Sequence, residues 1–116
     1  MTLSDLKTRC EENKIAFAYG VFKKPTEPPH LAATEVASSN FLADNLVYKR
    51  IKNLKMDYTF VDKDIETEDI IENTILQDVA WEKSDEVYLQ DEKCWQVSYF
   101  FDIREENKKW EKLNSV

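Results

Sequence analysis

The strongest constraint on the fold of this chain lies between Ala18 and Val36. The stretch AYGVFKKPTEPPHLAATEV contains the only glycine of the sequence, Gly20, its only histidine, His30, and all three prolines. Glycine tolerates positive φ, whereas proline fixes φ and lacks an amide hydrogen. Residues 21–30 are therefore not expected to form a helix. We interpret the stretch as a joint between a leading helix and a sheet that makes up most of the remaining chain.

The residues before the joint have the pattern of a short amphipathic helix. Apolar side chains recur at i, i+3 and i+7 from Leu3 onward, with charged residues between them. Thr2 is suited to the N-cap and Asp5 to the third helical position, as in a capping box. The sequence predicts a helix over residues 3–13, followed by a brief extended segment that leads to Gly20.

Two segments after the prolines have strand character. Residues 30–36 predict a weak strand, and either isomer is open to the Pro28–Pro29 bond, because about 5–6% of X-Pro bonds in folded proteins are cis. Residues 47–61 alternate more strongly, but the phase changes near Lys52–Asn53, which predicts a bulge or twist there. At about 3.4 Å per residue, a strand of this length is expected to project beyond a small domain.

The segment between these strands, residues 37–46, is polar, small and without clear periodicity. It predicts a long mobile loop, and long loops often carry function. Phe41 and Leu42 are its unusual members. Two readings are open for them: they fold back onto the core, or they are held out for a partner.

The second half of the chain changes from helical to strand spacing. Residues 65–79 place apolar side chains at i, i+4 and i+8 and acidic side chains in the first turns, which predicts a helix. We interpret its acids as a solvated face rather than as catalytic carboxylates. Residues 87–89 and 94–103 then predict a hairpin around a polar turn at residues 91–93.

This order predicts an α+β fold: a three- or four-stranded, mainly antiparallel sheet with two main helices on one face and the long mobile loop. Residues 1–103 are expected to form a single domain. Residues 104–116 form a charged C-terminal tail, in which the spacing of Trp110 and Leu113 suggests a frayed helix or an anchoring segment.

Several classes of function are disfavoured by the residues themselves. Cys10 and Cys94 are too few for a disulfide framework, and with one histidine they make no zinc site. His30 has no partnering nucleophile motif, and a single glycine excludes a phosphate-binding glycine loop. The net charge of −7 argues against binding to a phosphate backbone. We therefore expect no enzyme, no cofactor and no metal.

The hydropathy of the sequence predicts where the protein is located. No run of about 18 apolar residues and no secretory signal is apparent, so we expect no membrane contact and a protein that stays soluble in the compartment where it is made. What remains is surface for contacts with other proteins.

Particular motifs resemble a family of small proteins from long-tailed bacteriophages and prophages. They are Ala18–Phe22 (AYGVF), Pro28–Pro29, residues 40–48 with Ala43–Asp44 and Val47–Tyr48, and Tyr58–Thr59 followed by Asp62–Lys63–Asp64. The family is similar to tail-completion and tail-terminator proteins, also called tail-to-head joining proteins. The resemblance covers about residues 3–103. It departs at His30, where the family usually has tyrosine, at residues 31–33, and in the tail from Arg104.

The resemblance implies a structural protein of the virion, assembled in the cytoplasm of the bacterial host. It would form a ring, typically a hexamer, that caps the tail tube, contacts the head connector and lets DNA pass without specific binding. An acidic lumen would repel DNA. The alternative is a small acidic phage adaptor or inhibitor that binds a host protein. The candidate interface residues are Tyr19, Phe22, His30, Phe41, Leu42, Asp44, Asn45 and Tyr48.

Overall fold

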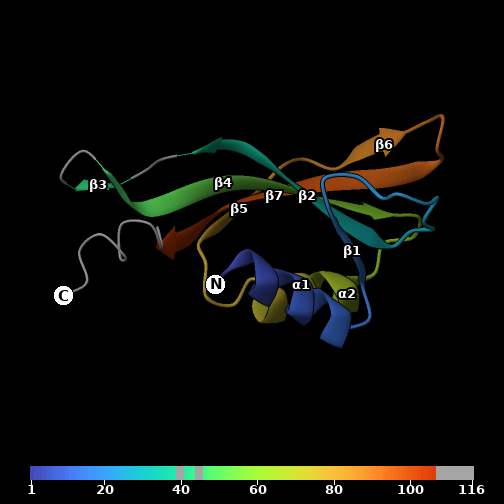
Figure 1. Cartoon of the computed structure of the whole chain (residues 1–116). Helices are drawn as coiled ribbons and strands as arrows, with labels where there is room; N and C mark the ends of the chain where they lie inside the picture. Colours follow the sequence, from blue (N-terminus) through green and yellow to red (C-terminus); the bar gives the residue numbers. More distant parts are fainter. Residues whose placement is uncertain (39–40, 44–45, 107–116) are drawn as a thin grey trace.

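The computed structural model describes residues 1–38, 41–43 and 46–106, which form an α+β fold on a mixed sheet (Figure 1). The expected class is confirmed. In chain order the elements are α1 (Leu3–Glu12), β1 (Ala16–Tyr19), β2 (His30–Ser38), β3 (Phe41–Ala43), β4 (Leu46–Phe60), α2 (Ile65–Ile70), the π-helical turn η1 (Ile71–Ile75), β5 (Trp81–Lys83), β6 (Val87–Leu89) and β7 (Cys94–Glu106).

Helix α1 begins as its sequence predicts. The Thr2 hydroxyl accepts a hydrogen bond from the Asp5 amide at 3.1 Å, and the Asp5 carboxylate accepts one from the Thr2 amide at 2.9 Å. This reciprocal capping box satisfies two amides that a helix N-terminus would otherwise leave unpaired. It also lowers the pKa of Asp5, chiefly through the bond from the Thr2 backbone.

The sheet contains more strands than the three or four expected. Its strand order is β1-β2-β4-β7-β5, with β3 also paired to β4 and β6 also paired to β7. β1 runs parallel to β2, and the other pairs are antiparallel. β3, β5 and β6 have only three residues each, which is too short for alternation to mark them reliably.

The predicted joint lies within the sheet rather than between the helix and the sheet. Residues 20–29 connect β1 to the parallel strand β2, which a tight hairpin cannot do. Gly20 adopts φ +96° at the start of this connection and donates its amide to the Ala33 carbonyl at 2.7 Å. The Pro28–Pro29 bond before β2 is cis.

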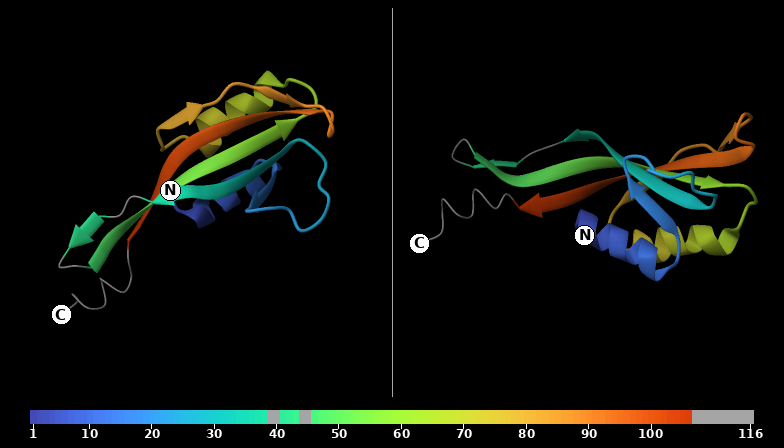
Figure 2. Two further views of the ribbon diagram at one scale, coloured as in Figure 1. Left: turned by 90° about the horizontal axis from the view of Figure 1, so that it is seen from above. Right: turned by 45° about the vertical axis from the view of Figure 1, so that its right-hand side comes forward.

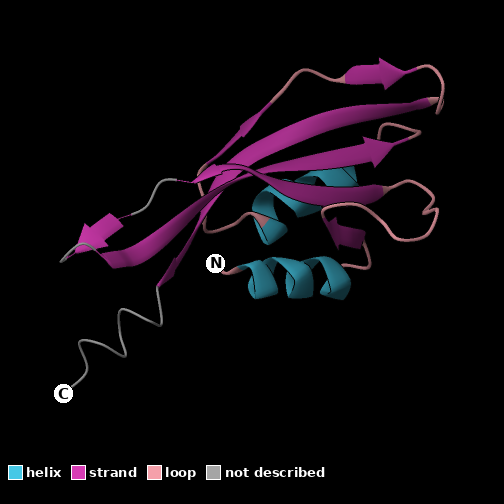
Figure 3. Cartoon of the chain, turned by 45° about the horizontal axis from the view of Figure 1, so that its top comes forward, coloured by secondary structure: helices cyan, strands magenta, loops and turns pink. Residues whose placement is uncertain are grey.

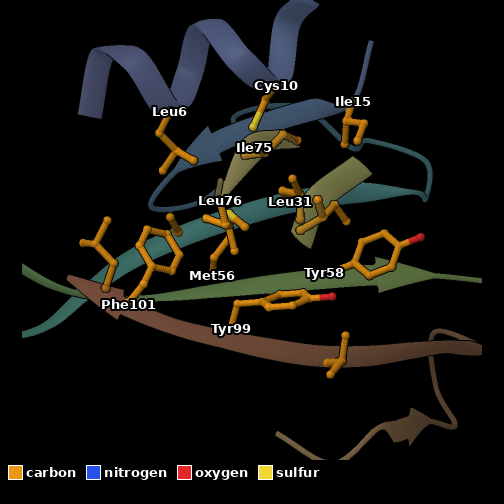
Figure 4. Packing of buried hydrophobic residues seen from close by; sticks show 14 of the residues in the cluster. Leu6, Cys10, Ile15, Leu31, Met56, Tyr58, Ile75, Leu76, Tyr99 and Phe101 are labelled. Atoms are coloured by element: carbon orange, nitrogen blue, oxygen red, sulfur yellow. The ribbon is translucent and has the colours of Figure 1, made fainter. Parts of the chain in front are cut away.

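The core brings together buried residues of α1, η1 and the strands of the sheet (Figure 4). Leu6 and Cys10 of α1 and Ile75 of η1 are fully buried in it. The strands contribute alternate residues, as a half-buried sheet requires. These are Leu31 and Ala33 of β2, Leu54, Met56, Tyr58 and Phe60 of β4, and Val97, Tyr99, Phe101 and Ile103 of β7.

The bulge predicted near Lys52–Asn53 of β4 lies opposite these residues, in the neighbouring strand β2. β4 pairs with β7 without interruption from Lys49 to Phe60. The register shift occurs in β2, where Glu35 and Ala37 face consecutive residues of β4. Val36 is therefore the extra residue, so the phase change in β4 does not mark an irregularity of β4 itself.

The second helix is shorter than the predicted 65–79. α2 begins after the N-cap Asp64, whose carboxylate accepts the Glu66 amide at 3.1 Å, and it widens into η1 at Ile71. The amide of Leu76 bonds to the carbonyl of Ile71 at 2.9 Å, and the helix ends there. Arg9 of α1 donates to the Ile75 carbonyl at 3.0 Å, so a tertiary contact caps this end.

The predicted mobile loop at residues 37–46 is wrong for the part that is described. β2 continues to Ser38, and Phe41–Ala43 pairs with the beginning of β4 as strand β3. β7 likewise continues three residues beyond its predicted end at Ile103, to Glu106. The remainder of the predicted tail, residues 107–116, lies outside the described residues.

Candidate protein interface

The sheet is longer than the helical layer that covers it. The molecule measures 55 × 27 × 26 Å, and Figures 2 and 3 show the far ends of β4 and β7 beyond α1 and α2. We call this part the arm. Its backbone comprises residues 37–38, 41–43, 46–53 and 102–106. β4 contributes three basic residues to it, Lys49, Arg50 and Lys52.

Tyr19 lies at the end of β1 and is 47% exposed. It lines a surface depression of about 380 Å³ between β1 and α1, together with Leu3, Ser4, Lys7 and Phe17. The register pairs Tyr19 with Ala33, which is buried in the core. Tyr19 therefore belongs to the helical side of the sheet.

Phe22 and His30 form a second, separate contact. Their ring centroids are 4.9 Å apart in an edge-to-face arrangement, which holds the β1–β2 connection against the start of β2. Burial lowers the pKa of His30, and its Nδ1 is buried without a hydrogen-bond partner. His30 pairs in register with Ala16, so it lies on the face opposite to Tyr19.

The remaining predicted interface residues fall in or beside the arm. Phe41 and Leu42 lie in β3, and Tyr48 lies in β4 between the residues that pair with them. Asp44 and Asn45 lie outside the described residues. The eight predicted residues thus divide among three places: the depression beside α1, the Phe22–His30 contact and the arm.

A network of charged side chains, which the sequence did not reveal, connects α2 and η1 to the strands. Glu68 is only 7% exposed and accepts from Lys63 at 2.9 Å and from Lys83 at 3.3 Å. Lys63 also pairs with Glu86. Glu68 is thus not part of a solvated face, whereas Glu66 of the same helix is exposed.

Glu72 is the second buried acceptor of this network. It accepts from Lys83 at 2.9 Å and from the hydroxyl of the fully buried Tyr99 at 2.7 Å. Burial favours the neutral form of Glu72, but the bonds from Lys83 and Tyr99 outweigh burial, so the pKa of Glu72 is lowered. Burial and the same bond raise the pKa of Tyr99. The arrangement fixes the helical segment on the sheet and keeps Tyr99 a hydrogen-bond donor.

Arg9 and Asp78 form the main charged contact between α1 and the end of η1. The two terminal guanidinium nitrogens of Arg9 donate to the two carboxylate oxygens of Asp78, at 2.8 and 3.1 Å. The bond from Arg9 lowers the pKa of Asp78 to about 2. Residues 69 positions apart in sequence make this contact, so no local pattern could have indicated it.

The groups that could support chemistry are dispersed. Cys10 and Cys94 are free and buried, and burial raises the pKa of the Cys10 thiol to about 12. No group of histidine, cysteine and acidic residues among the described positions could hold a metal ion. No helix within the described part of the chain is long and apolar enough to cross a membrane.

Comparison with protein-family models and with curated proteins gives no match to this chain.

Proposed function

We propose that this protein is a structural subunit of a bacteriophage tail, which caps the tail tube or joins the tail to the head as part of a ring, typically a hexamer. Its partners in this proposal are further copies of itself, the tail-tube protein and the head-connector protein. DNA passes through the ring without specific binding. The protein is assembled in the host cytoplasm and ends in the virion.

The observation that carries the proposal is the arm. β4 and β7 remain paired as far as Lys49 and Glu106, beyond Leu54 and Ile103, which are the last buried residues of these strands among the positions whose burial is described. A domain of this size does not need such an extension for its own core. A head-to-tail ring does need two different surfaces on each subunit, because its contacts are heterologous.

The second surface in this proposal is the face that carries the Phe22–His30 contact. We infer that α1 and α2 cover one face of the sheet only, as Figure 1 suggests, and that the other face is left to a neighbour. The arm of one subunit would then reach the Phe22–His30 side of the next. The connection between β1 and β2 contains Gly20–Phe22 of one motif that resembles the phage family and Pro28–Pro29, which is another.

Charge also favours a ring that DNA traverses without binding. Twelve acidic residues and only two lysines lie between residues 61 and 92, whereas the rest of the chain has eleven acids and fourteen basic residues. If this acidic part of each subunit lines the lumen, it repels phosphates. A basic lumen in the assembled ring would contradict this part of the proposal.

The decisive experiment is electron microscopy of phage particles assembled without this protein. Overlong tails would indicate a terminator, and finished tails beside full heads that fail to join would indicate a joining protein. Supplying the protein in trans should restore complete particles. Normal, infectious particles in its absence would refute both versions of the proposal.

The acidic segment favours one alternative, a small phage adaptor or inhibitor that binds a basic surface of a host protein. Pull-down with the intact protein distinguishes the two functions. A stoichiometric host protein, released by salt and absent when Glu66 and Asp69 are changed to lysine, would favour the adaptor. Incorporation of the protein into purified virions would favour the tail subunit.

A further inference from the structure

A small depression lies at the end of β4 that is opposite to the arm. Its volume is about 220 Å³, below the range of about 300–1,000 Å³ that is usual for pockets that bind drug-sized ligands, so it suits a single side chain. Pro28–Pro29 and Phe60 give it an apolar wall. The charged residues among its described lining are two acids, Asp62 and Asp64.

The hydroxyl of Tyr58 is a polar group of this depression that lacks a partner. Tyr58 lines the depression and is only 1% exposed, and its hydroxyl makes no hydrogen bond to another described residue. Figure 4 shows this hydroxyl pointing toward the end of β4. Buried polar groups in proteins nearly always have a hydrogen-bond partner, so the hydroxyl indicates a polar group on a ligand.

The electrostatic surroundings of this hydroxyl are negative. Burial, followed by the charges of Glu68 and Asp64, raises the pKa of Tyr58 to about 12. The charge of Lys63 has a smaller, opposite effect, and its ammonium donates to Glu68 at 2.9 Å and pairs with Glu86. A negative potential beside an apolar wall favours a ligand that carries a positive charge.

Asp62 and Asp64 provide acceptors for such a charge. The carboxylate of Asp64 accepts the Glu66 amide at 3.1 Å and the Thr67 hydroxyl at 2.8 Å, which fix its position and leave a further lone pair on each oxygen. Asp62 is exposed, and its carboxylate makes no hydrogen bond or ion pair with another described residue. The depression thus combines one fixed carboxylate, one free carboxylate and one unpartnered hydroxyl.

We propose that this depression binds an arginine side chain of a partner protein. The planar guanidinium packs on the apolar wall and donates to several acceptors at once, whereas the ammonium of lysine is compact and strongly hydrated. The oxygen of Tyr58 accepts one of these hydrogen bonds, and Asp62 and Asp64 accept the others. A free amino acid fits less well, because its α-carboxylate meets two acids and no basic side chain in the described lining. This inference does not depend on the function proposed above.

Backbone amide chemical shifts of the intact protein measure this binding. The probe is N-acetyl-arginine methylamide, which should shift amides of residues 58–67 at millimolar concentration. The citrulline compound, which has the same shape without the charge, should bind about tenfold more weakly. The lysine compound and free arginine should each bind severalfold more weakly. Absence of these shifts, or equal binding of the citrulline or lysine compound, would overturn the proposal. Equal binding of free arginine would overturn the assignment to a partner protein.

Variants of the lining test which residues hold the arginine. Asp62→Asn should weaken binding of the arginine compound about tenfold, and Tyr58→Phe should weaken it severalfold. Val61→Asp adds a carboxylate at the rim and should not weaken it. Asp69→Asn, which makes the same charge change at an exposed position of α2 outside the lining, should have no effect. The amide spectrum of each variant shows whether it folds. Equal losses from Asp62→Asn and Asp69→Asn would show attraction by net charge alone and would refute the site.

Discussion

The same two strands form both the core of this protein and its arm, and the two halves are held in different ways. In the helix-covered half, β4 and β7 bury Leu54, Met56 and Tyr99 against α1 and η1. In the arm, described backbone pairing continues without a helix beside it. Beyond Leu54 of β4 and Ile103 of β7, which are buried, the described backbone pairing continues to Lys49 and Glu106.

This difference separates two roles that one strand can have. Burial of apolar area is the main favourable term in the free energy of folding. A backbone hydrogen bond contributes little net stability, because it replaces hydrogen bonds that the same groups make to water in the unfolded chain. The covered half should therefore determine the free energy of unfolding. The arm is free to be selected for contacts with other molecules. The predictions below test this division, from the largest expected effect to the smallest.

The largest difference in the loss of stability should appear between alanine substitutions of a buried residue of β4 and of a residue of β4 in the arm. Leu54, which is 1% exposed, packs in the core, whereas Ile51 is only half-buried. Leu54→Ala should lower the free energy of unfolding by about 2–5 kcal/mol through lost burial and a residual cavity. Ile51→Ala should cost about 1 kcal/mol or less. Urea unfolding of both variants measures the contrast, and equal losses would contradict the division.

A smaller loss of stability is expected when one hydrogen bond is removed from the network that holds η1 on the sheet. Tyr99→Phe removes the hydroxyl that donates to Glu72 at 2.7 Å but keeps the buried ring. Hydrogen bonds to charged groups contribute about 1.5–3 kcal/mol, so unfolding should become easier by about 2 kcal/mol.

The matched control for this substitution is Tyr58→Phe, which removes a hydroxyl from another buried tyrosine of the same face and leaves the contacts of Glu72 unchanged. The Tyr58 variant should lose less stability in thermal or urea unfolding. If the two variants were equally destabilised, the bond to Glu72 would have no special role.

The sequence predicted those features that depend on local pattern. The Thr2–Asp5 cap, the alternation of β7 and the turn at residues 91–93 follow from spacings within a few residues. The sequence also predicted the length of β4. By contrast, the bulge was assigned to the wrong strand, because the phase change visible in β4 is matched by an extra residue, Val36, in its partner.

The errors elsewhere have one common cause, which is contact between segments distant in sequence. The second helical segment ends with η1 at Ile75, whose carbonyl accepts a hydrogen bond from Arg9 of the first helix. β3 forms because β4 offers it a partner, not because its own three residues have strand alternation. The candidate interface residues stay a prediction, and two of them, Tyr19 and His30, lie on opposite faces of the sheet.

The Arg9–Asp78 pair predicts a pH dependence within the covered half. The pKa of Asp78 is lowered to about 2 in the folded chain, from an ordinary value of 3.8. Its contribution should therefore be complete above about pH 5, should decrease as the pH falls through 4 toward 2, and should disappear below about pH 2. Because the Asp78 side chain is 44% exposed and screened by solvent, we expect about 1 kcal/mol or less.

The measurement for Asp78 is the difference in unfolding free energy between the native chain and Asp78→Asn across this pH range. Glu72, whose pKa is also lowered, changes in both proteins and cancels in the difference. The difference should shrink toward pH 2. A difference that stays constant between pH 5 and pH 2 would show that Asp78 has no charge-dependent role.

The smallest effect on folding should accompany the largest effect on assembly. Val36 is 54% exposed and lies at the bulge where the arm begins, so Val36→Asp should change the free energy of unfolding by about 0.5 kcal/mol or less. If the arm contacts the next subunit, a charge at this position should prevent ring formation or tail attachment. Val61→Asp provides the control, because Val61 is 53% exposed just after the opposite end of β4 and should tolerate the same charge without loss of stability. Complementation of particles that lack the protein, followed by electron microscopy, measures attachment. A Val36→Asp protein that folds normally and restores complete particles would show that the base of the arm is not a contact surface. Any contact that explains why the sheet extends beyond the core would then lie at the far end of the arm.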